Sequence, residues 1–125
     1  MAKKLVVVLT VFLAPALIAF AALSGGPQMT VDVVYGSADG VDLKLDLAKP
    51  ATGAGPFPAV LCVHGGAWQA GSKGDFDGLI RNFAENGYVA ASAEYRMAPT
   101  YKWPAAIEDV KCAVRYLRSH AKELS

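Results

Sequence analysis

The segment Ala59-Val60-Leu61-Cys62-Val63-His64-Gly65-Gly66-Ala67-Trp68 decides the fold of this chain. Its first five residues are apolar throughout, which is typical of a strand that is covered on both faces of a sheet. A histidine and two glycines follow at once, so backbone N–H groups with little side-chain cover lie at the edge of that sheet. Donors in this position are suited to a negatively charged oxygen that develops during acyl transfer. The segment therefore predicts a buried strand followed by a candidate oxyanion loop.

Two further strands are predicted before this segment. Residues 29–35 and 41–47 suit strands, and the second alternates apolar and charged side chains over its full length. The residues between them, 36–40, end in Asp-Gly, a strong hairpin signal. Residues 49–58 contain three prolines and two glycines and predict a loop. The folded part of the chain is therefore expected to open with an antiparallel pair.

Helices alternate with strands after the segment. Residues 75–86 predict a helix whose apolar stripe consists of Phe76, Leu79, Ile80, Phe83 and Ala84, and Gly87 stands at a suitable stop position. Residues 88–95 predict a buried strand. A last helix begins at Pro104, and its inward face is expected to carry Ile107, Val110, Ala113, Val114 and Leu117. This order predicts an α/β fold in which a mostly parallel sheet follows the hairpin and helices cover both faces.

Residues 1–24 form a separate unit. Two lysines precede a long apolar run over residues 5–23, and small residues at its end fit a signal-peptidase site. We expect a signal peptide that is cleaved after Ala21 or Ser24, with an uncleaved membrane anchor as the alternative. In both cases residues 25–125 form an extracytoplasmic domain, secreted or periplasmic.

Charge and motif content exclude several function classes. The whole chain carries a net charge of +1. Without the two lysines of the leader, ten basic side chains face eleven acidic ones and no basic cluster remains, so no nucleic-acid partner is expected. No metal-ligand spacing and no phosphate-binding glycine loop occurs, so neither a metal nor a cofactor is expected. Cys62 and Cys112 are expected as free thiols, although an oxidising compartment permits a disulfide.

Five motifs then carry a family resemblance. They come in the order His64–Trp68, Ala70–Lys73, Gly87–Val89, Tyr95–Pro99 and Trp103–Val110. Together they resemble the N-terminal part of α/β-hydrolases of the esterase/lipase group, namely hormone-sensitive-lipase-like carboxylesterases and the feruloyl-esterase-like BD-FAE branch. The resemblance covers about residues 35–117. It implies a carboxylic ester hydrolase that acts through an acyl-enzyme on a small-molecule or polysaccharide-linked ester.

The resemblance also assigns roles around the candidate loop. It implies that the N–H groups of Gly66 and Ala67 form the oxyanion hole, with His64 and Gly65 supporting the loop. Ala67 stands where the lipase-like pattern often has another glycine. Trp68 is predicted either to line the substrate pocket or to pack the loop against the sheet, and the sequence leaves both alternatives open.

A nucleophile elbow of the form Gly-x-Ser-x-Gly does not occur in the 125 residues. By resemblance, we expect a Ser-Asp/Glu-His triad downstream of Ser125, so the chain alone is predicted to be truncated before the elbow and inactive as an esterase. The alternatives are a formamidase or peptidase of the same fold, and a non-catalytic remnant or binding module.

One charged pair and two surface residues complete the predictions. Arg96 is expected to pair with Asp109 or, alternatively, with Glu108, because an arginine that opens a loop at the sheet edge can tie that loop to the next helix. Lys73 and Asp75 are expected at the surface near the start of a helix, with Asp75 as a candidate N-cap.

Overall fold

A computed structural model describes residues 25–124, so the expected signal peptide lies outside the described residues. Its elements, in chain order, are β1 (Gln28–Ala38), β2 (Val41–Lys49), β3 (Ala59–Val63), the 3₁₀ helix η1 (Lys73–Phe76), α1 (Asp77–Glu85), β4 (Val89–Ala93), α2 (Ala105–Ser119) and α3 (Ala121–Leu124). Among residues 25–124, no helix has the length and apolar composition that crossing a membrane requires.

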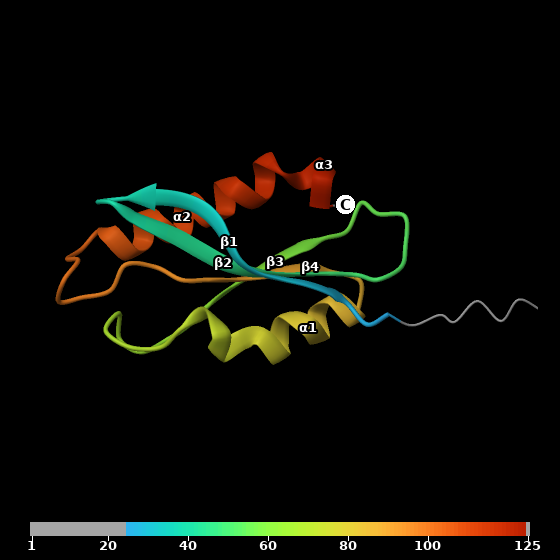
Figure 1. Cartoon of the computed structure of the whole chain (residues 1–125), viewed down its shortest axis with the longest axis horizontal. Coiled ribbons are helices and arrows are strands. Elements are labelled where there is room, and N and C mark those ends of the chain that lie inside the picture. The colour runs from blue at the N-terminus through green and yellow to red at the C-terminus, as the bar shows by residue number, and fades with distance from the viewer. Residues whose placement is uncertain (1–24, 125) are drawn as a thin grey trace, which may run out of the picture.

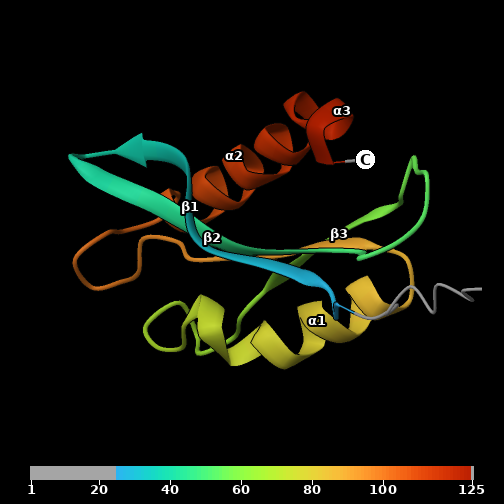
Figure 2. The same cartoon turned by 45° about the vertical axis from the view of Figure 1, so that its right-hand side comes forward.

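The four strands form one sheet in the order β1-β2-β4-β3. The pairings of β1 with β2 and of β2 with β4 are antiparallel, and β3 and β4 are parallel, so the described sheet is mixed. The parallel pair needs a crossover connection, which η1 and α1 supply. Figures 1 and 2 show α1 on one face of the sheet and α2 with α3 on the other. The predicted α/β fold with helices on both faces is thereby confirmed.

The opening hairpin is confirmed, and its strands are longer than predicted. Asp39 and Gly40 form the turn with φ of 50° and 74°, the left-handed pair that a tight hairpin turn requires. β1 is irregular, with register shifts between Thr30 and Val33 and between Val34 and Gly36. These shifts are β-bulges, which bend the strand over the sheet.

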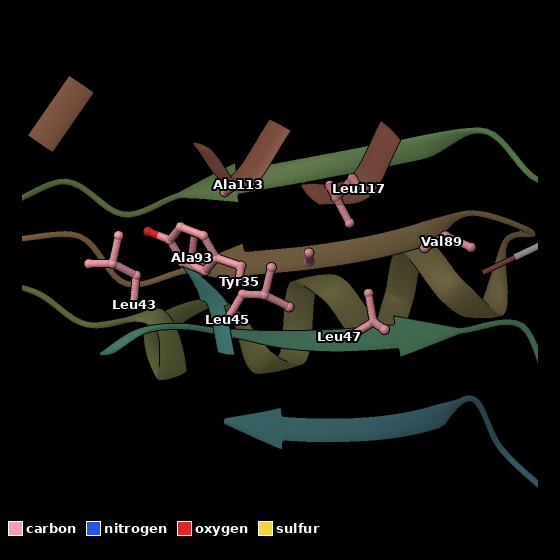
Figure 3. Packing of buried hydrophobic residues seen from close by; sticks show 9 residues of the cluster. Tyr35, Leu43, Leu45, Leu47, Val89, Ala93, Ala113 and Leu117 are labelled. Atoms are coloured by element: carbon pink, nitrogen blue, oxygen red, sulfur yellow. The ribbon is translucent and has the colours of Figure 1, made fainter. Parts of the chain in front are cut away.

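The larger core cluster lies between the sheet and α2. Leu43, Leu45 and Leu47 of β2 alternate onto this face, as the period of a strand dictates. Figure 3 shows them packed with Tyr35, Val89, Ala93, Ala113 and Leu117. Ala91 completes the cluster. Alanines at three of these positions let the helix lie close to the sheet.

A smaller cluster fills the α1 side of the sheet and consists of Ala48, Cys62, Ile80, Ala84 and Ala90. Cys112 packs instead against the larger cluster on the α2 side. Both cysteines are free, because the sheet separates them.

Two residues of the predicted apolar stripes are exposed. Leu79 is 42% exposed and Ile107 is 40% exposed. Leu79 is exposed because the first turn of the predicted helix is the 3₁₀ helix η1, and α1 begins only at Asp77. The face of α1 that packs on the sheet therefore differs from the predicted one. In the second case the buried residues of α2 recur every four positions from Ala105 to Leu117, which leaves Ile107 on another side of the helix.

Candidate active site

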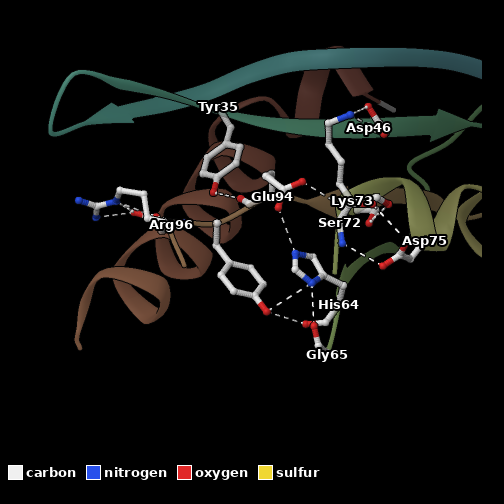
Figure 4. A network of polar contacts seen from close by, with 12 residues as sticks. Tyr35, Asp46, His64, Gly65, Ser72, Lys73, Asp75, Glu94 and Arg96 are labelled. Atoms are coloured by element: carbon white, nitrogen blue, oxygen red, sulfur yellow. Dashed lines mark hydrogen bonds and ion pairs between the residues drawn. The ribbon is translucent and has the colours of Figure 1, made fainter. Parts of the chain in front are cut away.

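The loop of residues 64–73 connects the carboxyl end of β3 to η1. Since β3 and β4 are parallel, the residues that follow β4 lie at the same edge of the sheet. Figure 4 shows His64 and Lys73, the two ends of the loop, on either side of Glu94. The predicted candidate loop thus lies beside Glu94–Arg96, the segment that directly follows β4.

The backbone of the loop is left-handed over three consecutive residues. Gly66, Ala67 and Trp68 have φ of 108°, 52° and 60°. The carbonyl of Gly66 accepts hydrogen bonds from the N–H groups of Gln69 at 3.0 Å and Ala70 at 3.1 Å, which closes the turn. A left-handed conformation costs a residue with a Cβ about 1–2 kcal/mol, so the structure maintains strain at Ala67 and Trp68.

This conformation leaves backbone donors free. Within the described part of the chain, the N–H groups of Gly66 and Ala67 have no hydrogen-bond acceptor. Both residues are exposed at the end of β3. Two adjacent N–H groups without an acceptor are what an oxyanion hole needs.

Of the loop's three glycines at positions 65, 66 and 71, only Gly66 and Gly71 cannot be replaced, because a side chain there would overlap its neighbours and the backbone is left-handed. A Cβ on Gly66 would lie 2.0 Å from the carbonyl oxygen of Ala70, and one on Gly71 would lie 2.4 Å from Nδ1 of His64. Gly65 has open space at this position among the described atoms. The turn therefore depends on Gly66 and Gly71, whereas Gly65 tolerates a side chain.

The His64 ring is buried and held at both of its nitrogens. Nε2 lies 3.2 Å from Oε1 of Glu94, and Nδ1 lies 2.9 Å from the carbonyl oxygen of Gly65. The ring stacks on Tyr95 with 4.3 Å between centroids, and the Tyr95 hydroxyl donates to the carbonyl oxygen of His64 at 2.9 Å. These contacts suit a residue that supports the loop.

Glu94 and Tyr95 were not among the predicted site residues. Oε2 of Glu94 accepts a hydrogen bond from the backbone N–H of Lys73 at 3.1 Å, so one carboxylate contacts both ends of the loop. Ser92 adds a bond from its hydroxyl to the carbonyl oxygen of Lys73 at 2.7 Å. The signal available in the sequence was a single charged residue at the end of an otherwise apolar strand.

The expectation that Lys73 is a surface residue is wrong. Its Nζ lies 2.9 Å from both carboxylate oxygens of the buried Asp46 and 3.1 Å from Oδ1 of Asp32. Burial lowers the pKa of Lys73, but the hydrogen bonds to the two carboxylates outweigh it and the net pKa is raised. Burial and the charge of Asp46 also raise the pKa of Asp77 nearby. Three acidic side chains thus gather around one lysine below the loop.

Asp75 is not the N-cap of the helix. Ser72 occupies the N-cap position of η1, and Asp75 at the third helical position accepts a hydrogen bond from the backbone N–H of Ser72 at 2.9 Å. The hydroxyl of Ser72 lies 3.2 Å from the same carboxylate. The Ser72 hydroxyl is therefore engaged in the capping interaction.

Arg96 and Asp109 are in direct contact. Asp109 accepts bonds from the backbone N–H of Arg96 at 2.9 Å and from its guanidinium at 2.7 Å. Asp39 of the hairpin turn contacts the same guanidinium, and the ring of Tyr101 lies 5.6 Å from its carbon. The hydrogen bonds to Asp109 raise the pKa of Arg96 above its usual range. The pair ties the loop after β4 to α2 and to the hairpin.

A cavity of about 350 Å³ adjoins the candidate oxyanion donors. Its lining includes Ala67 and Trp68 of the loop together with Tyr101, Lys102 and Trp103. Trp68 lines the cavity and is 65% exposed, so its ring is part of the cavity wall and is not packed inside the loop. Trp103, also in the lining, is 79% exposed. Among residues 25–124, no group of three or more His, Cys, Asp or Glu side chains is arranged to hold a metal ion.

Comparison with known proteins relates this chain to one hydrolase family and to curated enzymes similar to it. The BD-FAE family model matches residues 45–125. A probable carboxylic ester hydrolase, LipM, of Mycobacterium tuberculosis is 34% identical over 94 residues, which cover 71% of this chain and 20% of LipM. The kynurenine formamidase of Danio rerio is 32% identical over 87 residues, covering 70% of this chain and 29% of that protein.

Solved structures add a likeness in three dimensions. The thermophilic esterase Est2 of Thermogutta terrifontis superposes with a TM-score of 0.70 at 37% identity, covering 79% of this chain and 36% of that one. The same esterase phosphorylated by paraoxon gives a TM-score of 0.69 at 37% identity, covering 79% and 38%. This chain thus spans roughly a fifth to two fifths of the length of these relatives.

Proposed function

Because this chain belongs to the BD-FAE family of α/β-hydrolases, we propose that it supplies the oxyanion-binding part of a carboxylic ester hydrolase. The N–H groups of Gly66 and Ala67 are the donors in this proposal. During attack on an ester carbonyl they bind the oxygen that becomes negatively charged in the tetrahedral intermediate. The cavity beside Trp68 then holds part of the ester substrate, either a small molecule or a polysaccharide-linked ester.

One observation carries this proposal. The loop keeps Ala67 and Trp68 in a strained left-handed conformation, and the N–H groups of Gly66 and Ala67 are without acceptors among the described residues. Strain reduces stability, so it persists where function requires it, and the two exposed donors are free to bind an oxyanion. Both features also occur beside a cavity of substrate size.

The nucleophile in this proposal lies outside residues 1–125. Ala70-Gly71-Ser72-Lys73-Gly74 comes nearest to an elbow motif in the sequence. Its serine, however, caps η1 through Asp75 in an extended conformation, with φ of −153° and ψ of 162°. A nucleophile elbow would instead place the serine on a sharp turn between a strand and a helix. A serine, an acid and a histidine beyond Ser125 would complete the triad, and the 125 residues alone would be inactive.

Paraoxon labelling combined with peptide mapping tests this assignment. Paraoxon transfers its diethylphosphoryl group to an activated serine hydroxyl and releases p-nitrophenolate. We expect no adduct and no p-nitrophenyl acetate turnover with the 125-residue chain. A polypeptide that extends beyond Ser125 should hydrolyse the ester and carry the adduct outside residues 1–125. An adduct on Ser72 would refute the assignment.

A proline variant tests the donors in the longer polypeptide. Ala67→Pro removes one N–H group and cannot adopt the φ of 52° found there, because proline fixes φ near about −65°. We expect kcat for p-nitrophenyl acetate to fall by roughly 10²–10³, the usual effect of losing an oxyanion donor. Full activity of this variant would contradict the role of the loop.

Amide hydrolysis is a second candidate, and the similarity to a formamidase favours it. The same donors would stabilise the tetrahedral intermediate of an amide. Parallel assays with p-nitrophenyl acetate and an N-formyl arylamine separate the two activities. A larger kcat/KM for the N-formyl compound would favour the formamidase.

We also propose that residues 1–24 are a signal peptide and that residues 25–125 are the N-terminal part of an extracytoplasmic hydrolase domain. Two lysines followed by an apolar run and small residues support this. N-terminal sequencing of the protein recovered from the extracytoplasmic fraction should begin at Ala22 or Gly25. Recovery with Met1 in the membrane fraction would indicate an anchor instead.

A further inference from the structure

Two carbonyl groups at the start of the residue 64–73 loop are held by one tyrosine and by the ring that it stacks on. The Tyr95 hydroxyl donates a hydrogen bond to the carbonyl oxygen of His64 at 2.9 Å. The Tyr95 ring stacks on the His64 ring, with 4.3 Å between the centroids and 14° between the planes. The His64 ring in turn lies against the next carbonyl, since its Nδ1 is 2.9 Å from the oxygen of Gly65 (Figure 4). Tyr95 therefore contacts the first carbonyl directly and the second through the ring of His64.

The directions of the two free N–H groups follow from the carbonyl groups that precede them. A peptide group is planar, and in the trans form its C=O and N–H bonds point in opposite directions. The peptide bonds of residues 64–67 are trans. The N–H of Gly66 shares a peptide group with the carbonyl of Gly65, so it points away from the His64 ring. The N–H of Ala67 is opposed in the same way to the carbonyl of Gly66, which the turn itself holds. A contact that fixes a carbonyl thus fixes the donor that follows it.

The Tyr95 side chain is suited to a fixed position. It is buried, with 5% of its surface exposed. Burial and the charge of Glu94 raise the pKa of Tyr95, so the hydroxyl keeps the hydrogen that it donates. Three residues later, the backbone N–H of Ala98 donates to the carbonyl oxygen of Trp68 at 2.8 Å. Residues 95–98 therefore hold the left-handed turn both before and after its free donors.

We propose that Tyr95 is a positioning residue for the oxyanion donors, because its hydroxyl and ring fix the peptide groups that set the direction of the Gly66 N–H. Without the hydroxyl the ring can still stack, but the carbonyl of His64 is released and the peptide groups after it can rotate. The donor is then present but points correctly for only part of the time. This inference rests on the proposed function, since it assumes that the donors of the loop bind an oxyanion.

Two tyrosines of the chain provide a matched pair of variants. Tyr95→Phe removes the hydroxyl and keeps the ring that stacks on His64. The Tyr35 hydroxyl also donates to a backbone carbonyl, that of Glu94, at 2.6 Å, and Tyr35 is 6% exposed. Tyr35→Phe therefore loses the same kind of hydrogen bond at the same depth, but its hydroxyl does not contact the loop. Both variants should lower the urea midpoint, so stability alone does not distinguish them.

NMR order parameters of the backbone N–H groups in the 125-residue chain test the proposal without catalysis. In the wild type and in Tyr35→Phe, we expect about 0.85 at Gly66, the value of a rigid backbone. In Tyr95→Phe, the Gly66 value should fall below about 0.6, the range of a flexible segment. A Gly66 value that stays above this limit in Tyr95→Phe would overturn the proposal. A value below it in the wild type or in Tyr35→Phe would also overturn it.

Kinetics of an active longer polypeptide provide a second test. Tyr95→Phe should lower kcat for p-nitrophenyl acetate about tenfold and leave KM within about twofold, because the donors act on the transition state more than on the bound ester. The expected loss is smaller than the roughly 10²–10³ for a missing donor, because the N–H of Gly66 is still present. Tyr35→Phe should keep kcat within about twofold of the wild type. A rise in KM with kcat unchanged in Tyr95→Phe would overturn the proposal.

The two proposals fail separately. The order parameters require no catalysis, so the expected fall at Gly66 without ester hydrolysis by the longer polypeptide would support the role of Tyr95 in fixing this N–H and reject the esterase. Ester hydrolysis with a Gly66 N–H that stays rigid in Tyr95→Phe would support the esterase and reject the role of Tyr95.

Discussion

Gly65 and Gly66 are neighbours in the sequence, but we predict opposite results when each is replaced by alanine. A Cβ on Gly66 would lie 2.0 Å from the carbonyl oxygen of Ala70 and 2.5 Å from its carbon, and both are backbone atoms that cannot rotate away. The φ of 108° at Gly66 is also unfavourable for any residue with a side chain. At Gly65 the same addition meets open space among the described atoms, and φ is not left-handed.

These differences set the expected magnitudes. For Gly66→Ala, the left-handed backbone costs about 1–2 kcal/mol and the shift that relieves the overlap costs about 1–3 kcal/mol. We therefore expect the free energy of unfolding to fall by about 2–5 kcal/mol. For Gly65→Ala, the alanine reduces the entropy of the unfolded chain and should change the free energy of unfolding by less than about 1 kcal/mol. The two variants should thus differ clearly.

Urea unfolding of the full chain, followed by far-ultraviolet circular dichroism, measures both variants. With a common dependence on denaturant, the shift in midpoint gives the change in stability directly. Equal midpoints for the two variants would refute the reasoning. So would a Gly66→Ala midpoint within error of the wild type, because it would mean that the loop does not adopt the turn described.

Three further predictions concern the strain and charges around the site. Ala67→Gly should raise the free energy of unfolding in urea by about 0.5 kcal/mol, because relief of the left-handed alanine slightly exceeds the entropy cost of glycine. Asp109→Ala should lower the free energy of unfolding by about 3–5 kcal/mol in the same assay, because the Asp109 side chain is only 2% exposed and its loss leaves Arg96 buried and unpaired. Asp39→Ala should lower it by less than about 1 kcal/mol, because the Asp39 side chain is 67% exposed. Asp77→Asn should raise stability by about 0.5 kcal/mol at neutral pH, because the raised pKa of Asp77 means that its ionised form is disfavoured in the folded state. That gain should disappear as pH falls and Asp77 becomes protonated, so urea midpoints at neutral and acidic pH check the sign.

Local patterns predicted most of the elements. The Asp39-Gly40 turn, the β3 strand and the stop at Gly87 each depend on a few adjacent residues, and the structure contains all three. Gly87 ends α1 with bonds from its own N–H to Ala84 and from the Tyr88 N–H to Phe83. The helix faces were predicted less well. Leu79 and Ile107 fit the helical period of the sequence, but packing against the sheet buries only part of each predicted stripe and leaves both of them exposed.

The candidate loop could be located from the sequence, but the side chains outside the loop that contact it could not. His64 and Lys73 bracket the loop, while Glu94 directly follows β4 and Asp46 belongs to β2. These contacts depend on strand order, because β4 lies between β2 and β3. Periodicity says which face a residue occupies but not which strand is its neighbour. The buried Asp46 and the partly buried Lys73 therefore look like surface residues until the neighbours are known.

The position of β3 also bears on how the site opens. Among the described strands, β4 is its one neighbour, and β4 is paired in turn with β2. A fluctuation that detaches β4 frees every amide of β3 bonded to it, whereas detaching β3 leaves the pairing of β4 with β2 intact. In hydrogen-exchange terms, the amides of β3 cannot be better protected than those of β4. Among the described strands, the residue 64–73 loop thus begins on a strand that is no better protected than its parallel neighbour.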